Sequence, residues 1–386
     1  MNALRMLLPL LAIAILGEGL HPAGAAERKT QNVVLITADG LRWQEMFRGA
    51  EASLMTRDPG GVRDTNGLAA RFWRETPESR REALFPFLWG RVAREGQLLG
   101  NQDKGSVIRV TNGRNFSYPG YSEFLTGVAD SRIVSNSKLP NPNTNVFEWL
   151  SGRPGFRGRV GAVVNWDVIP WILNVERSHI PVWSGYPLPP KAVERIEPPA
   201  AVARLMEATT PIWKDVILDA YTAQAAVEHV AKAKPRLLYV AFGETDEWAH
   251  DGRYDLYLGA AHNVDRFAAR LWEQMERMPE YRGKTTFIIT TDHGRGVSPV
   301  RWKNHGAEIE ESGAIWMAVI GPDTRLADTI VRANAVVQNT VARESVIGED
   351  CTVGPYVSLR AGTNLARGAH VGTFVETKNA EIGEEA

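Results

Sequence analysis

Residues 32–40 read NVVLITADG, a β-branched apolar run that ends in an aspartate and a glycine. Two later stretches have the same form, RLLYVAFGETDEWAH at 236–250 and TTFIITTDHGRG at 285–296. Nearly continuous hydrophobicity is typical of strands buried in a parallel sheet. The three expected strands span residues 33–37, 237–242 and 287–290. Because ligands of open α/β sheets bind beyond the carboxyl ends of the strands, we expect the acidic residues after these strands to meet at one rim.

Helix-like stretches separate the expected strands, notably residues 222–233 and 257–278. Strands that alternate with helices predict an α/β fold, with a doubly wound, mostly parallel sheet and helices on both faces. We expect this domain to occupy residues 27–325. Two stretches, 51–83 and 131–215, are rich in Pro, Gly, Asn and Trp and only weakly periodic, which predicts loop-like insertions over the rim.

The first 26 residues have the order of a secretory signal peptide: one Arg, an apolar run over 6–15, and small residues at 23–26. Ten apolar residues are too few for a stable membrane span, so we expect a periplasmic or secreted protein. A membrane anchor or an N-terminal tail is the alternative. The net charge of −1 gives no reason to expect a nucleic-acid partner. Since Cys351 is the single cysteine, the ligands of any metal must come from Asp, Glu and His.

The character of the sequence changes after about residue 325. An aliphatic residue recurs every six positions, at Val341, Ile347, Val353, Leu359, Leu365 and Val371. A hexapeptide repeat of this kind predicts a parallel β-helix over residues 326–386. About three coils fit in this length, which is short for independent stability.

Metal-ligand residue types gather at the expected rim. Asp246 and His250 are four residues apart, which places both side chains on one face of a helix. The other candidates follow strands or stand in a loop: Asp39, Asp292, His293 and His305. Each has an ordinary structural explanation, because an Asp after a strand often caps the next helix and a loop His is usually solvated. Their joint occurrence at neighbouring strand ends favours a metal site.

The segment NFSYPGYSEFLTG at 115–127 contains Ser117, either a turn residue or a nucleophile. In chain order, VLITADG, this Ser-x-Pro segment leading to LTG, TDEWAH, TTDHG and NHG resemble the alkaline phosphatase superfamily. The closest branch is the nucleotide pyrophosphatase/phosphodiesterase-like (type I phosphodiesterase) group, and the likeness spans roughly residues 32–323.

The resemblance implies a hydrolase of small-molecule phosphoesters with two divalent metal ions at the carboxyl rim of the sheet. Zn²⁺ suits such mixed carboxylate and imidazole ligands, with Mn²⁺ as the alternative. One ion would be held by Asp246, His250 and His305. The other would be held by Asp39, Asp292 and His293 together with the oxygen of Ser117. The resemblance further implies that Ser117 is a metal-activated nucleophile that forms a phosphoserine-type intermediate, and that Asn136 contacts a phosphate oxygen.

Other members of the superfamily provide the alternative activities. Sulfatases mature a Cys or Ser within C/S-x-P-x-R, and Tyr121 stands here where that motif has Arg. Metal-dependent phosphomutases have a similar ligand set but are cytoplasmic and carry a large inserted domain. Monoester and diester substrates both remain open. Arg42 and Arg114 are candidate phosphate contacts, and five aromatic residues are candidates either for a substrate slot or for the core: Tyr118, Tyr121, Trp166, Trp171 and Trp248.

The C-terminal segment resembles the left-handed β-helix of the bifunctional N-acetylglucosamine-1-phosphate uridylyltransferase/acetyltransferase. Arg360 and Lys378 match basic residues that bind the sugar nucleotide there. The catalytic His of that domain would follow residue 386, so we expect a homotrimerisation surface rather than acetyl transfer. A fusion or a truncation is the alternative origin of this segment.

Overall fold

The computed structural model describes residues 29–322, 325–327, 329–332, 335–337, 340–354, 357–372 and 375–386. The expected signal peptide at 1–26 lies outside the described residues and stays a prediction. Within the described ranges, no helix combines the length and the apolar character needed to cross a bilayer.

A seven-stranded sheet forms the centre of the protein, in the order β2-β9-β7-β1-β6-β4-β5. Its strands are β1 (Asn32–Ala38), β2 (Gln97–Leu99), β4 (Val160–Val164), β5 (Val182–Trp183), β6 (Leu237–Phe242), β7 (Thr285–Thr290) and β9 (Met317–Ile320). Among the described strands of this sheet, β9 alone runs in the direction opposite to the others. The mostly parallel sheet is therefore confirmed. Because β1 pairs with both β6 and β7, the carboxyl ends of the three predicted strands lie side by side.

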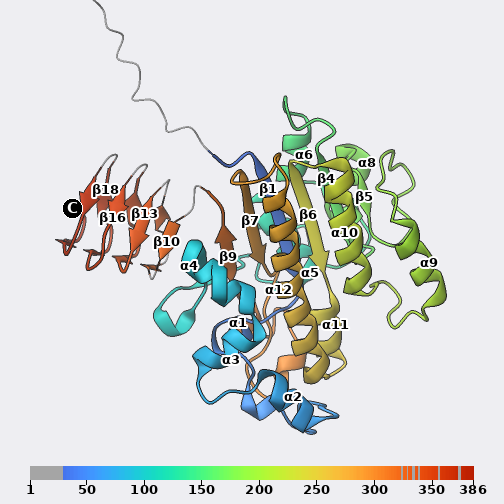
Figure 1. Cartoon of the computed structure of the whole chain (residues 1–386), viewed down its shortest axis with the longest axis horizontal. Helices are drawn as coiled ribbons and strands as arrows, with labels where there is room; N and C mark the ends of the chain where they lie inside the picture. The colour runs from blue at the N-terminus through green and yellow to red at the C-terminus, as the bar shows by residue number, and fades with distance from the viewer. Residues whose placement is uncertain are drawn as a thin grey trace, which may run out of the picture.

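Side chains alternate across the sheet and pack into two cores. On β1, Val34 and Ile36 belong to one core and Leu35 to the other. The first core receives α10 (Asp219–Ala233) and α12 (Tyr254–Arg277), which lie in front of the sheet in Figure 1. The second receives α5 (Ser117–Thr126) and α6 (Val146–Ser151). The predicted covering of both faces is thus confirmed.

The remaining elements of the main domain are short. The other α-helices are α1 (Trp43–Arg48), α2 (Thr65–Phe72), α3 (Pro77–Leu84), α4 (Ala93–Glu95), α7 (Ile169–Ile172), α8 (Val175–Ser178), α9 (Ala200–Ala208) and α11 (Glu244–His250). A separate strand pair is formed by β3 (Ile108–Arg109) and β8 (Ala314–Ile315).

The predicted helices are present, and each begins three residues earlier than expected, at Asp219 and Tyr254. The prediction of a loop-like insertion over 131–215 is wrong in part, because β4 and β5 of this stretch belong to the main sheet. All five residues of β4 are buried. The strand is short and surrounded by Gly and Pro, so it gave little periodic signal. The stretch 51–83 contains α2 and α3 rather than loop alone.

The C-terminal segment forms three small parallel sheets, in the orders β10-β13-β16-β19, β11-β14-β17-β20 and β12-β15-β18. It extends from the β9 side of the main sheet (Figure 1). Its strands are β10 (Arg325–Ala327), β11 (Ile330–Val331), β12 (Val336–Val337), β13 (Val341–Arg343), β14 (Val346–Ile347), β15 (Thr352–Val353), β16 (Ser358–Leu359), β17 (Asn364–Leu365), β18 (His370–Val371), β19 (Glu376–Thr377) and β20 (Glu381–Ile382).

Five of the six aliphatic positions in the predicted repeat are buried in one core: Ile347, Val353, Leu359, Leu365 and Val371. Val341 is the exception, at 38% exposed, and its neighbour Ala342 fills the core instead. The step from Ala342 to Ile347 is five residues rather than six, which shifts the inward position. Three sheets with parallel pairing are what a β-helix requires, and the left-handed β-helix itself stays a prediction.

Candidate metal centre

The carboxyl ends of three adjacent strands deliver most of the candidate ligands. Asp39 follows β1, α11 follows β6, and Asp292 and His293 follow β7. Parallel pairing of β1 with both neighbours brings these loops to one rim, as the sequence predicted. Ser117 begins α5 and His305 lies in the loop before β8.

One group of ligand atoms comprises Asp246, His250 and His305, all within 4.8 Å of one another. The Nε2 atom of His250 is 3.1 Å from Asp246 Oδ2 and 3.0 Å from His305 Nε2. The i, i+4 spacing in α11 therefore brings Asp246 and His250 together, as the sequence predicted. His305, from a loop distant in sequence, is the third member of the group. Two imidazole nitrogens and a carboxylate converging on one point are a donor set suited to a divalent transition metal.

A second group surrounds the Nε2 atom of His293. This nitrogen lies 3.2 Å from Asp39 Oδ1, 3.4 Å from Asp292 Oδ2 and 3.3 Å from Ser117 Oγ. Asp246 Oδ1 is 3.8 Å away, so Asp246 lies between the two groups. The structure therefore brings together all seven residues predicted for the metal centre, although they span the chain from residue 39 to residue 305.

The histidine tautomers suit metal binding. The Nδ1 atom of His293 donates to the Gly294 carbonyl at 2.9 Å, and that of His305 donates to the Asn115 carbonyl at 3.2 Å. Each contact leaves the Nε2 lone pair facing the other ligand groups. Such hydrogen bonds on the far side of the ring are typical of metal-ligating histidines.

Buried carboxylate oxygens without a hydrogen bond indicate that a cation fits this site. Among the described residues, Asp39 Oδ1 and Asp292 Oδ2 are buried and have no hydrogen-bond partner. Burial raises the pKa of Asp39, and the charge of Asp246 raises it further. Burial likewise raises the pKa of Asp292, followed by the charge of Asp39. Concentrated negative charge with open lone pairs is costly alone, and a bound divalent cation removes that cost.

Arg295 is a neighbour that the sequence analysis missed. Its buried guanidinium contacts Asp246 Oδ1, donates to the Asp246 carbonyl at 3.1 Å and to the Lys303 carbonyl at 2.6 Å. Burial alone would raise the pKa of Asp246, but Arg295, His250 and His305 together hold it well below its usual value. Nothing in the pattern of strands indicates which of the many Arg residues folds back onto the rim.

Two glycines allow close approach around the site. Gly40 has φ +60°, and a Cβ there would lie 2.6 Å from Asp246 Oδ1. A Cβ at Gly120, inside α5, would lie 2.3 Å from the Asp292 carbonyl oxygen. Gly120 thus lets α5 pack directly on the loop after β7, which holds Ser117 beside His293. Ser117 is the first residue of a helix rather than part of an isolated turn.

Asn136 lies beside the start of α5. Its Oδ1 accepts a hydrogen bond from the Tyr118 backbone N–H at 2.9 Å, and the residue is exposed. Because Tyr118 follows Ser117, this contact brings the Asn136 amide to the edge of the centre. Its NH₂ group is a donor that the Tyr118 contact does not use.

The structure favours the core explanation for three of the five aromatic candidates. Tyr121 is buried and its hydroxyl donates to Asp39 Oδ2 at 2.9 Å. Tyr118 and Trp166 are also buried in the second core. Trp248 is half-buried and packs edge-to-face on Trp213, with ring centroids 4.6 Å apart; Trp171 is also half-buried.

The two arginine candidates for phosphate contact differ. The prediction for Arg42 is wrong, because its guanidinium is fully buried and paired with Glu45. A buried ion pair of this kind holds the loop after β1 rather than reaching a substrate. Arg114 is exposed, and the structure shows no side-chain contact that assigns it to the site.

In the C-terminal segment, Arg360 and Lys378 directly follow the adjacent strands β16 and β19. The Arg360 backbone N–H donates to the Thr377 carbonyl at 2.9 Å, which places the two basic residues side by side along the stack. Both are exposed, and Arg360 pairs with Glu376 at 3.3 Å. Neither residue belongs to the two ligand groups.

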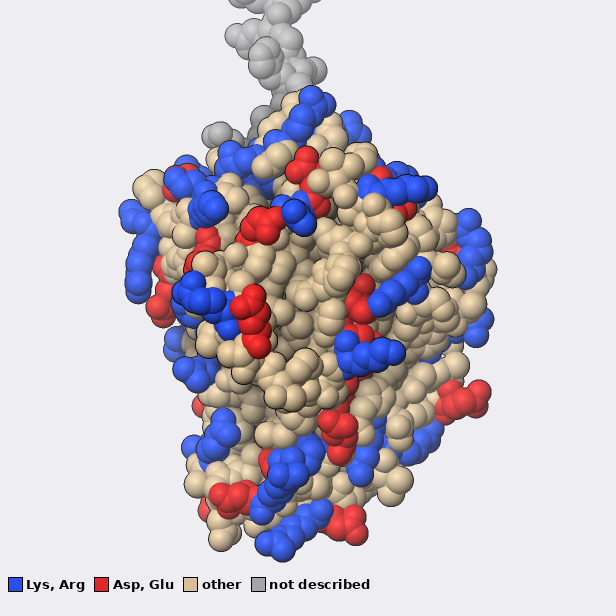
Figure 2. All heavy atoms as spheres, turned by 90° about the vertical axis from the view of Figure 1, so that its right-hand side faces the viewer, with Lys and Arg blue, Asp and Glu red and all other residues tan. Residues whose placement is uncertain are grey.

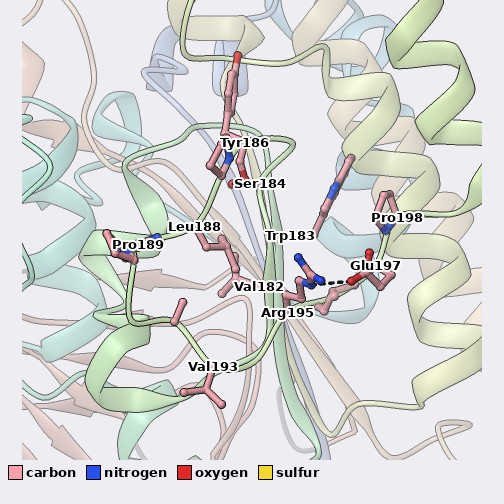
Figure 3. Close-up of a pocket in the computed structure, with 14 residues that line it drawn as sticks. Val182, Trp183, Ser184, Tyr186, Leu188, Pro189, Val193, Arg195, Glu197 and Pro198 are labelled. Carbon is pink, nitrogen blue, oxygen red and sulfur yellow. Dashed lines mark hydrogen bonds and ion pairs between the residues drawn. The ribbon is translucent and has the colours of Figure 1, made fainter.

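Surface features away from the rim are less informative. On the face shown in Figure 2, Lys and Arg side chains are interspersed with Asp and Glu. Figure 3 shows a hollow of about 590 Å³ that is lined by β5 and the loop after it, residues 184–198. None of the seven candidate ligands lines it.

Comparisons with known proteins identify a matching family and several similar structures. The sequence model of the family described as type I phosphodiesterase / nucleotide pyrophosphatase matches residues 66–340. Murine ectonucleotide pyrophosphatase/phosphodiesterase 5 is 12% identical, with a TM-score of 0.37 over 69% of this chain and 57% of that chain. The phosphonate monoester hydrolase of Agrobacterium radiobacter is 14% identical, with a TM-score of 0.43 over 76% of this chain and 68% of that chain.

A short segment near the C-terminus has different relatives. It is 54% identical over 67 residues to the bifunctional protein GlmU of Streptomyces avermitilis. The match covers 17% of this chain and 14% of the relative, so the chain spans only a small part of the curated relatives that it matches.

Proposed function

We propose that this chain, which belongs to the type I phosphodiesterase / nucleotide pyrophosphatase family of hydrolytic enzymes, is a two-metal phosphoric ester hydrolase. Its proposed nucleophile is Ser117. The observation that carries the proposal is the convergence on His293 Nε2 of Asp39, Asp292 and the Ser117 hydroxyl. The Ser117 hydroxyl is 3.3 Å from the His293 nitrogen and has unpaired carboxylate oxygens around it, so it would lie close to an ion held by these residues.

The residues divide into two holding groups. Asp39, Asp292 and His293 would hold one ion beside Ser117. Asp246, His250 and His305 would hold the other, and Asp246 also lies near Asp39 and His293. When bound, two divalent ions supply a lowered pKa for the Ser117 hydroxyl and positive charge beside the phosphoryl oxygens. Imidazole and carboxylate donors favour Zn²⁺, and Mn²⁺ is the alternative that metal analysis decides.

The protein groups then account for the reaction. The Ser117 hydroxyl loses its proton and its oxygen forms a bond to phosphorus as the bond to the leaving oxygen breaks. The leaving group takes up a proton and departs as an alcohol, which leaves a phosphoserine. Water attacks this phosphoserine in the second step, releases phosphate or a phosphate monoester, and restores the hydroxyl. We propose that the Asn136 NH₂ group donates to a phosphoryl oxygen, which its contact with the residue after Ser117 supports.

Phosphate rather than sulfate is the favoured ester because of Tyr121. Its hydroxyl is bound to Asp39 Oδ2, inside the core, where the sulfatase motif has Arg. We propose a diesterase or a broad phosphoric ester hydrolase, since the half-buried Trp248 of α11 packs on Trp213, and aromatic side chains suit the second substituent of a diester. The signal-like N-terminus supports a periplasmic or secreted site of action.

A separate role is proposed for the C-terminal segment. Its 54% identity to the bifunctional protein GlmU over 67 residues, and its three parallel sheets, support a β-helical assembly module that forms a homotrimer. Sedimentation of the full chain and of a chain ending at residue 325 tests this. We expect the full chain to be a trimer and the shortened chain to be a monomer with the same kinetic constants. A monomeric full chain would contradict the proposed trimerisation.

The test of the hydrolase proposal uses the purified full chain and three substrates: p-nitrophenyl phosphate, its bis-ester and p-nitrophenyl sulfate. We expect two equivalents of divalent metal and phosphoester hydrolysis that chelation abolishes. Ser117→Ala should lose at least a thousandfold in kcat. The matched control is Ser122→Ala, on the same helix, whose hydroxyl accepts from Asn141 instead. Phosphoester hydrolysis by Ser117→Ala at the rate of the control, or a preference for the sulfate, would overturn the proposal.

A further inference from the structure

The metal-binding helix α11 is tied at its start to another helix by reciprocal hydrogen bonds. Asp219 Oδ1, on the first residue of α10, accepts from the backbone N–H groups of Gly243 at 3.1 Å and Glu244 at 3.4 Å. In return, Glu244 Oε1 accepts from the Asp219 backbone N–H at 2.8 Å. Asn165 Nδ2 donates to the same Asp219 oxygen at 2.8 Å, which fixes the carboxylate. Each acidic side chain therefore caps the other helix.

A second buried contact ties α11 to the loop after β1. The Thr245 hydroxyl donates to the Asp39 carbonyl at 2.6 Å, and Thr245 is fully buried. The residue before Asp246 is thus bound to the backbone of a ligand in the other group. Glu244 Oε2 also accepts from Trp248 Nε1 at 3.3 Å, so the first turn of α11 is held from within as well.

Such ties bear directly on ligand geometry because α11 has only seven residues. Asp246 and His250 share this helix, but their partner His305 comes from a separate loop. A small rotation of α11 would keep Asp246 near His250 and would move both away from His305. The distances between His305 and the two ligands on α11 therefore depend on the position of the first turn of this helix.

From these contacts we infer that Asp219 is a positioning residue, which through Oδ1 sets α11 and thereby controls metal binding at the Asp246, His250 and His305 group. The inference rests on the proposed function, since it assumes that this group holds an ion. Asp219 touches none of the three ligand side chains and acts through the backbone of Gly243 and Glu244. Its second oxygen, Oδ2, has no hydrogen-bond partner among the described residues.

The two carboxylate oxygens of Asp219 differ in their contacts, so two substitutions can test the role of Oδ1 separately. Asp219→Ala removes the acceptor, whereas Asp219→Asn keeps an acceptor at Oδ1 and changes only the unpartnered position. We expect Asp219→Ala to weaken the binding of one metal equivalent by about tenfold to a hundredfold, the range for residues that orient metal ligands. The other equivalent should bind as in the unmodified chain. Asp219→Asn should restore both equivalents.

The measurement is a competition titration of the full chain with Zn²⁺ and a chromogenic chelator, combined with a thermal unfolding midpoint. Asp265→Ala is the matched control, because Asp265 is also buried and accepts from two backbone N–H groups, those of Phe87 and Leu88, away from α11. This control should lower the midpoint and keep both equivalents. A purely structural role for Asp219 would make the two alanine variants behave alike, which would overturn the inference.

Failure of the inference can be distinguished from failure of the proposed function. If the unmodified chain binds no metal, the proposed function fails and this inference fails with it. If it binds two equivalents and Asp219→Ala binds both as tightly, only the inference fails. Should Asp219→Ala not fold, Thr245→Val removes the other tie, and selective weakening of one equivalent is the result expected of it. Equal affinities in Thr245→Val would then overturn the inference.

Discussion

Replacing Arg42 by Met should destabilise the protein strongly and leave catalysis in the folded molecules nearly unchanged. The guanidinium is fully buried, and it bonds both carboxylate oxygens of Glu45 and donates to the Gly296 carbonyl at 3.2 Å. Glu45 is itself fully buried. The substitution therefore leaves a carboxylate inside the protein without a counter-charge.

The magnitude follows from what remains around Glu45. Breaking a buried ion pair by removing one partner costs about 3–5 kcal/mol. The hydroxyls of Tyr254 and Tyr257 still donate to Glu45, at 2.9 Å and 3.2 Å, which offsets part of that cost. We therefore expect a loss near the lower limit, about 3 kcal/mol in the free energy of unfolding, or roughly a hundredfold in the equilibrium constant.

Urea denaturation followed by tryptophan fluorescence measures this loss. The double variant Arg42→Met/Glu45→Gln removes the uncompensated charge and should recover part of the loss. KM for the bis-ester should stay within about twofold of the unmodified value, because Arg42 does not reach the rim. A loss below about 1 kcal/mol together with a large rise in KM would refute this reasoning and return Arg42 to the role of a phosphate contact.

Three further predictions concern single side chains. Gly40→Ala should lower metal affinity and kcat/KM at least tenfold, since its Cβ would lie 2.6 Å from Asp246 Oδ1 at φ +60°; chelator competition with unchanged affinity would contradict this. Tyr121→Phe removes the hydrogen bond to Asp39 Oδ2, so metal should bind about tenfold more weakly. The same titration measures this, and an unchanged Kd for the metal would contradict the prediction. Burial lowers the pKa of His229 from 6.5 to about 4, so the folded state resists the proton that the unfolded state takes up. The free energy of unfolding should therefore fall as the pH falls from about 6.5 towards 4. In His229→Gln the urea midpoint should depend less on pH in this range. An equal pH dependence in both proteins would contradict burial of His229 as the cause.

The sequence predicted the rim well because its signal is local. The three apolar runs end at Asp39, at Asp246 and at Asp292, and adjacent parallel strands can only deliver such residues to one edge. The i, i+4 spacing of Asp246 and His250 likewise needs no knowledge of the rest of the chain. His305 was a candidate because of its place in a loop, and only the order of the motifs assigned it to the group of Asp246 and His250.

Contacts that depend on packing could not be predicted in this way. Arg295 lies against Asp246, and Asp219 caps α11 from another helix, but neither side chain differs in sequence from a solvated one. Tyr121 was assigned by what it replaces in a sulfatase motif, and only the structure shows its bond to Asp39. The strands β4 and β5 were missed because two to five buried residues are too few for a periodic signal.

The central claim is that Ser117 carries the phosphoryl group between the two steps of the reaction. Acid quenching of the metal-loaded full chain during turnover of a radiolabelled phosphoester, followed by peptide mapping, measures this most directly. We predict label in the peptide that contains residues 115–127, attached to Ser117, and none in Ser117→Ala. An actively hydrolysing enzyme that carries no label on Ser117 at any quench time, alongside a Ser117→Ala variant that turns over normally, would contradict the account.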